Sequence, residues 1–162
     1  MPLLLGHDRD VPLQVHGRYS RGEVLAAFGH SPLGDPSEWR EGVRFERAAQ
    51  VDLFAVTLRK AERDFSPSTM YRDYAIGRDL FYWESQSTLT ERAPTAQRYI
   101  AHAARGSDVV LLVRPTKDDR AFICLGRARY VRHDGERPIA FVWRLDVPMP
   151  EWVFAAARTE VA

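Results

Sequence analysis

The C-terminal third of the chain alternates short apolar runs with turn residues, and this pattern constrains the fold more than any other feature. The runs cover residues 109–114, 121–125, 128–132 and 139–145. Short runs that are apolar or alternating are typical of β-strands, and Asp134-Gly135 lies where a tight hairpin would turn. We therefore predict a sheet built from this part of the chain.

Two further strands and three short helices are predicted elsewhere. Residues 51–58 and 80–86 are rich in β-branched and aromatic side chains, as strands are. The predicted helices begin after Ser20, which opens a capping box, and cover residues 94–105 and 151–158.

These elements follow no regular βαβ order. That favours an α+β fold with a curved, mainly antiparallel β-sheet or partial barrel, flanked by short helices. Because typical domains have roughly 150 residues, we expect residues 1–162 to form a single domain.

The composition is that of a globular domain with its own core, since 45% of the residues are apolar and 28% are charged. The longest apolar runs, such as residues 109–113, fall far short of the roughly 20 residues that cross a bilayer, so we expect no membrane association. Residues 1–6 do not resemble a signal peptide, and the lone Cys124 cannot form an internal disulfide. We therefore expect a cytoplasmic location.

Charge is segregated along the chain, although the net charge is only +1. Residues 92–144 hold 11 basic and 5 acidic side chains, and almost all the basic residues of the chain are arginine. A GC-rich genome would explain the choice of arginine over lysine, but it does not explain the segregation. Guanidinium groups suit phosphate contacts, which favours an anionic partner.

No pattern in the chain indicates a catalytic or metal site. The five histidines are scattered without zinc spacing, and there is no phosphate-binding loop and no nucleophile elbow. Cys124 lies inside a strand pattern and is expected to be buried, and the Asp118-Asp119 pair is expected in a solvated turn. We therefore expect no metal, no cofactor and no enzymatic activity.

The segment 65–87 combines six aromatic residues with many polar ones. If residues 80–87 form a strand, Phe81, Trp83, Ser85 and Ser87 face one way, and Tyr82, Glu84 and Gln86 face the other. Rings that stack and polar groups that read an edge are what a pocket for a nucleobase needs. The candidate base-pocket residues are Tyr71, Asp73, Tyr74, Trp83, Glu84, Ser85, Gln86 and Ser87.

Each of these residues also has an ordinary interpretation. Phe81 and Trp83 could be core residues of a small barrel, and Glu84 could form an ion pair with an arginine. Tyr71 and Tyr74 could pack in a turn. Four arginines are candidates for contacts with the nucleic-acid backbone, with a solvated basic face as the alternative: Arg98, Arg127, Arg129 and Arg132.

Several segments together resemble a known family. They are residues 13–29 (LQVHGRYSRGEVLAAFG), 52–91 with FSPSTMYRDYAI and LFYWESQS, 95–106 (TAQRYIAHAARG) and 122–150. The resemblance is to a bacterial domain-of-unknown-function family found at the C-terminus of DEAD/DEAH-type helicases that carry a phospholipase-D-like nuclease.

That resemblance implies a fold similar to the SET-and-RING-associated (SRA) domain, within the PUA-like group. It also implies recognition of modified cytosine in DNA by base flipping, in type IV restriction, with a helicase and nuclease as partners. We therefore expect a DNA-binding target-recognition module for a modified base, with 5-methylcytosine as the first candidate. The alternatives are an RNA-binding PUA-like module and a protein-interaction domain that couples to a helicase.

Overall fold

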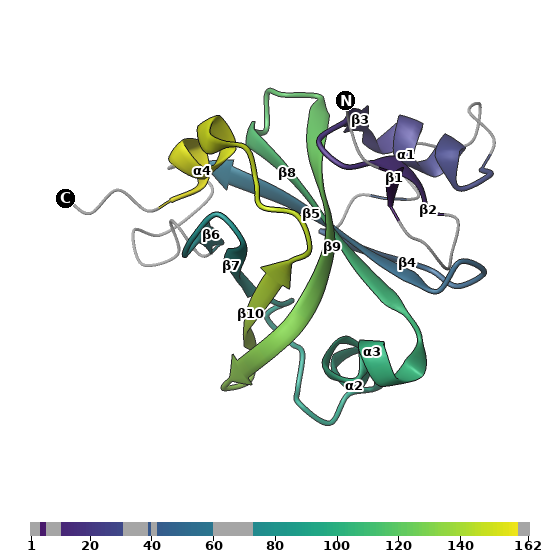
Figure 1. Cartoon of the computed structure of the whole chain (residues 1–162). Helices are drawn as coiled ribbons and strands as arrows, with labels where there is room; N and C mark the ends of the chain where they lie inside the picture. The colour runs from purple at the N-terminus through teal and green to yellow at the C-terminus, as the bar shows by residue number, and fades with distance from the viewer. Residues whose placement is uncertain (1–3, 6–10, 31–38, 40–41, 60–72, 159–162) are drawn as a thin grey trace.

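The computed structural model describes residues 4–5, 11–30, 39, 42–59 and 73–158 (Figure 1). The strands are β1 (Leu4–Leu5), β2 (Val11–Gln14), β3 (Arg18–Ser20), β4 (Val43–Glu46), β5 (Val51–Arg59), β6 (Tyr74–Ala75), β7 (Leu80–Glu84), β8 (Asp108–Thr116), β9 (Ala121–Asp134) and β10 (Ala140–Leu145). The helices are α1 (Arg21–Ala27), α2 (Pro94–Ile100), α3 (His102–Arg105) and α4 (Glu151–Ala157). No helix within these ranges has the length and apolar character that crossing a membrane requires.

Among the described strands, eight form one sheet in the order β4-β5-β8-β9-β10-β7-β6, with β3 paired to β9. The β5–β8 pair is parallel, and the other pairs of this sheet are antiparallel. Three strands separate β5 from β7 in this order, yet the ring of Phe54 on β5 stacks on Trp83 of β7, with 4.1 Å between ring centroids. The sheet therefore curls on itself into a partial barrel, and the predicted α+β class with a curved, mainly antiparallel sheet is confirmed.

The long strand β9 runs through the centre of the molecule (Figure 1). Two separate strands, 121–125 and 128–132, were expected here, and that division is wrong. Gly126 has φ +92°, and the β8–β9 register shifts beside it, so a bulge bends the strand without ending it. Strand β8 pairs with β9 on both sides of this bend. On the opposite edge of β9, β3 pairs before the bend and β10 pairs after it, from Ala128 onward.

The sheet buries apolar side chains on both faces. The core inside the curl includes Phe54, Phe81, Trp83, Tyr99, Phe141 and Trp143. The core on the outer face includes Leu13, Val24, Leu53, Leu112 and Phe122. Strands β5 and β8 contribute to both cores, which explains why their sequences are almost continuously apolar.

The helices agree with the predicted ones except at one break. Helix α1 has the predicted capping box, in which Glu23 N donates to Ser20 Oγ and Ser20 N donates to Glu23 Oε1. The single helix expected over residues 94–105 is instead divided into α2 and α3 at Ala101, whose φ of −101° departs from helical geometry. The predicted cap Gly106 does end this segment, in the left-handed conformation with φ +69°.

Candidate functional site

Strand β7 presents its side chains in the predicted alternation. Phe81, Trp83 and Ser85 are buried, whereas Tyr82 and Glu84 on the other face are half-buried. The strand ends at Glu84, so the two predicted pocket residues that follow Ser85 lie in an exposed stretch after it.

Trp83 lies in the core inside the curl and is only 5% exposed. One face of its indole is covered by Phe54, at an interplanar angle of 16°, and Tyr99 and Phe141 contact it from other sides. The core interpretation of Trp83 and Phe81 therefore fits the structure. Phe54 takes one face of the Trp83 ring, and contact of Trp83 with a base stays a prediction.

A cavity of about 300 Å³ lies beside Trp83, between β5 and the end of β7. Five of the eight predicted pocket residues line it: Asp73, Trp83, Glu84, Ser85 and Gln86. Across from them the described wall comes from Ala55, Val56 and Thr57 of β5 and from Arg21, the first residue of α1.

The cavity exists because β4 is shorter than β5. Pairing with β4 ends at Phe54, and the next N–H of β5, that of Ala55, donates to Gly42 O at 2.7 Å. Beyond this point no described strand pairs with that edge of β5. The curl brings β7 towards this free edge without hydrogen bonds between the two described strands, so the cavity lies along the seam of the partial barrel.

The β7 side of the cavity is acidic. Glu84 N donates to Asp73 Oδ1 at 2.9 Å, and the hydroxyl of Tyr82 donates to Glu84 Oε1 at 3.1 Å. Burial, and then the negative charge of Glu84 and this hydrogen bond, raise the pKa of Tyr82 to about 12. Two carboxylates thus lie on one wall, and both have hydrogen-bonding neighbours that orient the segment carrying them.

Ser85 has a structural role that the sequence did not indicate. Its hydroxyl donates to Gln86 O at 3.1 Å and accepts from Ile139 N at 2.9 Å, which ties the end of β7 to the residue before β10. The single O–H of this serine is therefore used within the protein. Asp73, Glu84 and Gln86 remain as predicted polar residues that could contact a ligand.

Two of the described pocket candidates, Tyr74 and Ser87, do not line this cavity. Tyr71 lies outside the described residues. Tyr74 stacks on Tyr82, with 4.7 Å between ring centroids, and Ser87 is exposed after β7. The structure therefore brings together the polar residues 84–86 with Asp73 and Trp83 but leaves Tyr74 and Ser87 outside the cavity.

Arg98 makes an internal ion pair. Its Nε and Nη2 donate to the two carboxylate oxygens of Asp52 at 2.8 and 2.9 Å, and its guanidinium lies 3.8 Å from the ring centroid of Phe45. The Asp52 side chain is completely buried. Burial raises the pKa of Asp52, and the hydrogen bonds and charge of Arg98 oppose that rise. The geometry thus gives Arg98 a structural role as the partner of Asp52, and its contact with nucleic acid stays a prediction.

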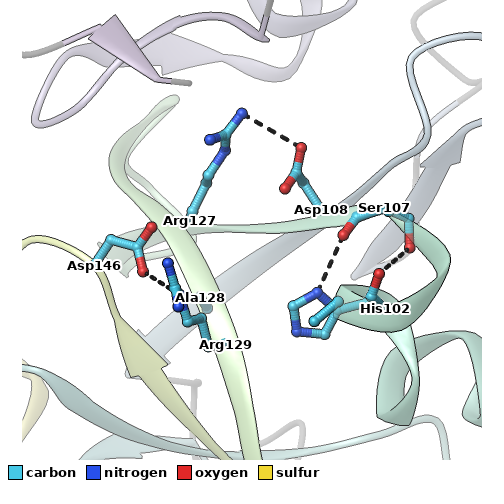
Figure 2. Close-up of a pocket in the computed structure, with 9 residues that line it drawn as sticks. His102, Ser107, Asp108, Arg127, Ala128, Arg129 and Asp146 are labelled. Carbon is cyan, nitrogen blue, oxygen red and sulfur yellow. Dashed lines mark hydrogen bonds and ion pairs between the residues drawn. The ribbon is translucent and has the colours of Figure 1, made fainter. Parts of the chain in front are cut away.

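Arg127 and Arg129 line a second cavity, of about 330 Å³, between α3, β8 and β9 (Figure 2). Arg127 Nη2 lies 3.4 Å from Asp108 Oδ2, and Arg129 Nε donates to Asp146 Oδ1 at 3.0 Å. The Arg129 side chain is 73% exposed, so its pair is open to water and to competing anions. Arg132 is exposed on β9 and has no ion pair with a described residue.

His102 belongs to the same cavity, but both of its ring nitrogens are occupied. Its Nε2 accepts from Tyr130 N at 3.1 Å, so Nδ1 carries the proton and donates to Ser107 O at 3.1 Å. These contacts fix the end of α3 against β9, and the imidazole thus serves the fold of this region.

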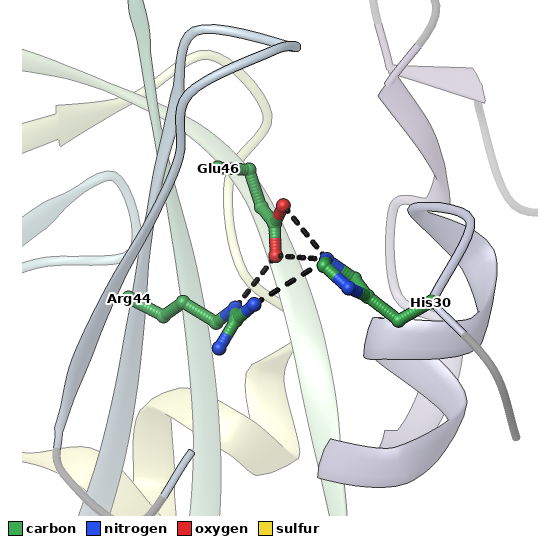
Figure 3. A network of polar contacts seen from close by, with 3 residues as sticks. All are labelled: His30, Arg44 and Glu46. Atoms are coloured by element: carbon green, nitrogen blue, oxygen red, sulfur yellow. Dashed lines mark hydrogen bonds and ion pairs between the residues drawn. The ribbon is translucent and has the colours of Figure 1, made fainter. Parts of the chain in front are cut away.

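Sequence reasoning missed a polar network next to α1 (Figure 3). His30 Nε2 lies 3.0 Å from both carboxylate oxygens of Glu46, and Arg44 Nε donates to Glu46 Oε1 at 2.6 Å. Burial favours a higher pKa for Glu46, but the hydrogen bonds and charges of Arg44 and His30 outweigh it, and the pKa is lowered. The available signal was the spacing of Arg44 and Glu46, which share one face of a strand.

In the part of the chain that the structure describes, no group of three or more histidine, cysteine, aspartate or glutamate side chains could hold a metal ion. Residues 13–156 match a family described as Domain of unknown function (DUF3427). The chain belongs to this family. Membership in a domain-of-unknown-function family is thereby confirmed, and the association of such domains with helicases stays a prediction. No curated protein matches the chain significantly.

Two crystal structures are similar to the chain, both of SUVH6 from Arabidopsis thaliana in complex with SAM. One is 13% identical over 93% of this chain with a TM-score of 0.48, and the other is 14% identical over 91% with a TM-score of 0.49. The chain spans 30% of the length of these solved chains.

Proposed function

We propose that this domain binds double-stranded DNA and reads a modified base, with 5-methylcytosine as the first candidate, by accepting the extruded base into the cavity between β5 and β7. The observation that carries the proposal is the convergence of Asp73, Trp83, Glu84, Ser85 and Gln86 on that one cavity. Its volume of about 300 Å³ is at the lower end of the range for small-ligand sites, which suits a single base.

The acidic wall supports the choice of base. Cytosine and adenine carry an exocyclic amino group that donates hydrogen bonds, and carboxylate oxygens accept them. Asp73 and Glu84 are therefore proposed to read the polar edge of the base, with Gln86 as a further contact. Trp83 and Val56 would form the apolar part of the wall, so the base gains contact without displacing the Trp83–Phe54 stack.

Contacts with the DNA backbone are assigned to Arg127, Arg129 and Arg132. The exposed pair of Arg129 with Asp146 costs little to exchange for a phosphate, because exposed ion pairs contribute about 0–1 kcal/mol. Three phosphate contacts correspond to a slope of about −3 for the logarithm of affinity against the logarithm of salt concentration.

The proposal assigns the domain no catalytic step. The family resemblance supports a role as the target-recognition part of a system in which a helicase and a nuclease act on modified DNA.

The test is a binding titration with otherwise identical duplexes that contain cytosine or 5-methylcytosine at one position. We expect affinity for the modified duplex to be about ten-fold higher or more, in the range that one discriminating base contact provides. Glu84→Gln should weaken binding to the modified duplex, because the amino group of the base loses a charged acceptor, whereas Glu151→Gln, which removes an exposed carboxylate from α4, should leave it unchanged. Equal affinity of the wild-type protein for both duplexes would overturn the reading of a modified base.

An RNA duplex of the same sequence serves as a further competitor in this titration. A preference for the RNA would indicate that the proposed pocket binds RNA and not DNA. If neither nucleic acid binds at low salt, the protein-interaction alternative is favoured.

A further inference from the structure

A second arginine cluster, which the sequence did not indicate, borders the proposed base cavity. Arg21 lines the cavity across from the acidic wall. Its Nε is buried and has no hydrogen-bond partner in the described part of the chain. The guanidinium lies 5.1 Å from the ring centroid of Phe122 and 5.7 Å from that of Trp39.

Arg114 shares the ring of Phe122 with Arg21, at 4.5 Å from its centroid. Its Nε donates to Thr57 Oγ1 and its Nη1 to Asp119 O, both at 2.9 Å. Thr57 also lines the cavity, so Arg114 is anchored directly behind the cavity wall. Two guanidinium groups thus gather around one ring.

Among the described residues, Arg21 has no acidic partner, since no described carboxylate forms an ion pair with it. Burial, and then the positive charge of Arg114, lower the pKa of Arg21, although an arginine stays charged at neutral pH. The indole Nε1 of the neighbouring Trp39 is a second buried donor without a partner among the described residues. Buried donors normally have acceptors, so this site suits a ligand rich in acceptor oxygens.

The cavity is therefore polarised, with carboxylates on the β7 wall and a guanidinium on the α1 wall. A nucleotide has the matching polarity, because its base can offer an amino group while its phosphate offers charged acceptors. We propose that Arg21, supported by Arg114, binds a phosphate adjacent to the nucleotide whose base enters the cavity. This inference rests on the proposed function, and it adds a phosphate subsite inside the reading site itself.

The planar guanidinium can donate two hydrogen bonds to one phosphate group, which fixes orientation as well as charge. Such a contact would hold the sugar-phosphate segment of the extruded nucleotide at the cavity mouth. Arg114, already held by Thr57 and Asp119, would act mainly through its charge and by positioning Arg21.

The test combines a protein substitution with a chemical one in the DNA. Duplexes carry a single uncharged methylphosphonate on either side of the modified nucleotide, and binding is titrated for the wild-type protein, for Arg21→Gln and for Arg21→Lys. At one of the two positions the neutral linkage should weaken wild-type binding about ten-fold or more, as loss of a charged hydrogen bond does. Arg21→Gln should weaken binding to the normal duplex by a similar factor, and the neutral linkage should then cost it nothing further.

Arg21→Lys keeps the charge without the planar fork and should give an intermediate loss, which also provides a variant if glutamine lowers the melting temperature. Arg105→Gln removes the same charge from an exposed position on α3 and should retain the full methylphosphonate effect.

The outcomes separate the two proposals. Suppose that the wild-type protein prefers the modified duplex, but that the losses from Arg21→Gln and from the methylphosphonate add up at both linkage positions. The phosphate subsite is then overturned, and the proposal that the domain reads the base survives. If the modification has no effect on affinity, the proposed function fails. Even in that case, an anion site at Arg21 would be supported if the neutral linkage at one position weakened binding of the wild-type protein but not of Arg21→Gln.

Discussion

Replacement of Arg98 by alanine tests whether this arginine serves the fold or the ligand. The Asp52 carboxylate is fully buried, and Arg98 donates one hydrogen bond to each of its two oxygens. Removing the guanidinium leaves a buried charge without its partner, which costs about 3–5 kcal/mol. For a chain of this size each kcal/mol shifts the melting temperature by about 2–4 °C, so we expect the melting temperature to fall by about 6–20 °C.

Two further variants identify the source of that loss. In Arg98→Ala/Asp52→Asn the buried charge is absent, so the double variant should be more stable than Arg98→Ala alone. If the two substitutions acted independently, their losses would add and the double variant would be less stable. Arg129→Ala removes an arginine whose ion pair is exposed and should cost less than about 1 kcal/mol.

The pH dependence provides an independent check. Burial already raises the pKa of Asp52 above its usual value of 3.8, and loss of Arg98 removes the interactions that oppose this rise. A carboxyl group with a raised pKa in the folded state stabilises the fold when it is protonated, and this contribution is lost as pH rises through the folded-state pKa. The deficit of Arg98→Ala, measured by urea unfolding, should therefore be larger at about pH 7 than at about pH 4. Wild-type stability together with a loss of DNA affinity in this variant would refute the structural role.

Three smaller predictions follow from single contacts. Ser20→Ala removes the capping box of α1 and should lower the free energy of unfolding by about 0.5–2 kcal/mol in urea titrations; no change would contradict the observed cap. Burial raises the pKa of Cys124 to about 12, so a thiol reagent should label this residue only after unfolding, and labelling of the native protein would argue against its burial. The pKa of Glu46 is lowered below its usual 4.5, so its carboxylate stabilises the fold above that pH and this contribution is lost as pH falls. Glu46→Gln should therefore be less stable than wild type at about pH 7, with the difference shrinking below about pH 4 in urea titrations.

Local patterns predicted the elements of the fold well, because the forces that define them act over a few residues. The period of two in residues 80–86 gave the inward and outward faces of β7. The Ser20 and Glu23 spacing gave the start of α1. The bulge at Gly126 was interpreted as a strand boundary, since a glycine with a positive φ interrupts the side-chain pattern whether or not hydrogen bonding continues.

The sequence predicted which segment forms the candidate site, but not what each residue does there. Trp83 was singled out for its ring, yet which partner covers that ring depends on the curl of the sheet, which brings Phe54 against it from a strand far away in the order. Arg98 was grouped with exposed arginines because its partner Asp52 is 46 residues away in sequence. No local pattern indicates Arg21 either, because Phe122 lies near it only through the folded sheet.

The position of the cavity follows from unequal strand lengths. Strand β5 has nine residues and β4 has four, so β4 covers only the first part of β5 and the Ala55–Gly42 hydrogen bond marks the end of that cover. A free strand edge normally invites pairing with another chain. Here the curl directs β7 and its acidic residues towards that edge, while Arg21 approaches from α1. If β4 were longer, its hydrogen bonds with β5 would extend into this seam and fill the cavity. The short β4 therefore leaves the barrel incomplete and also creates the space in which we propose that the base is read.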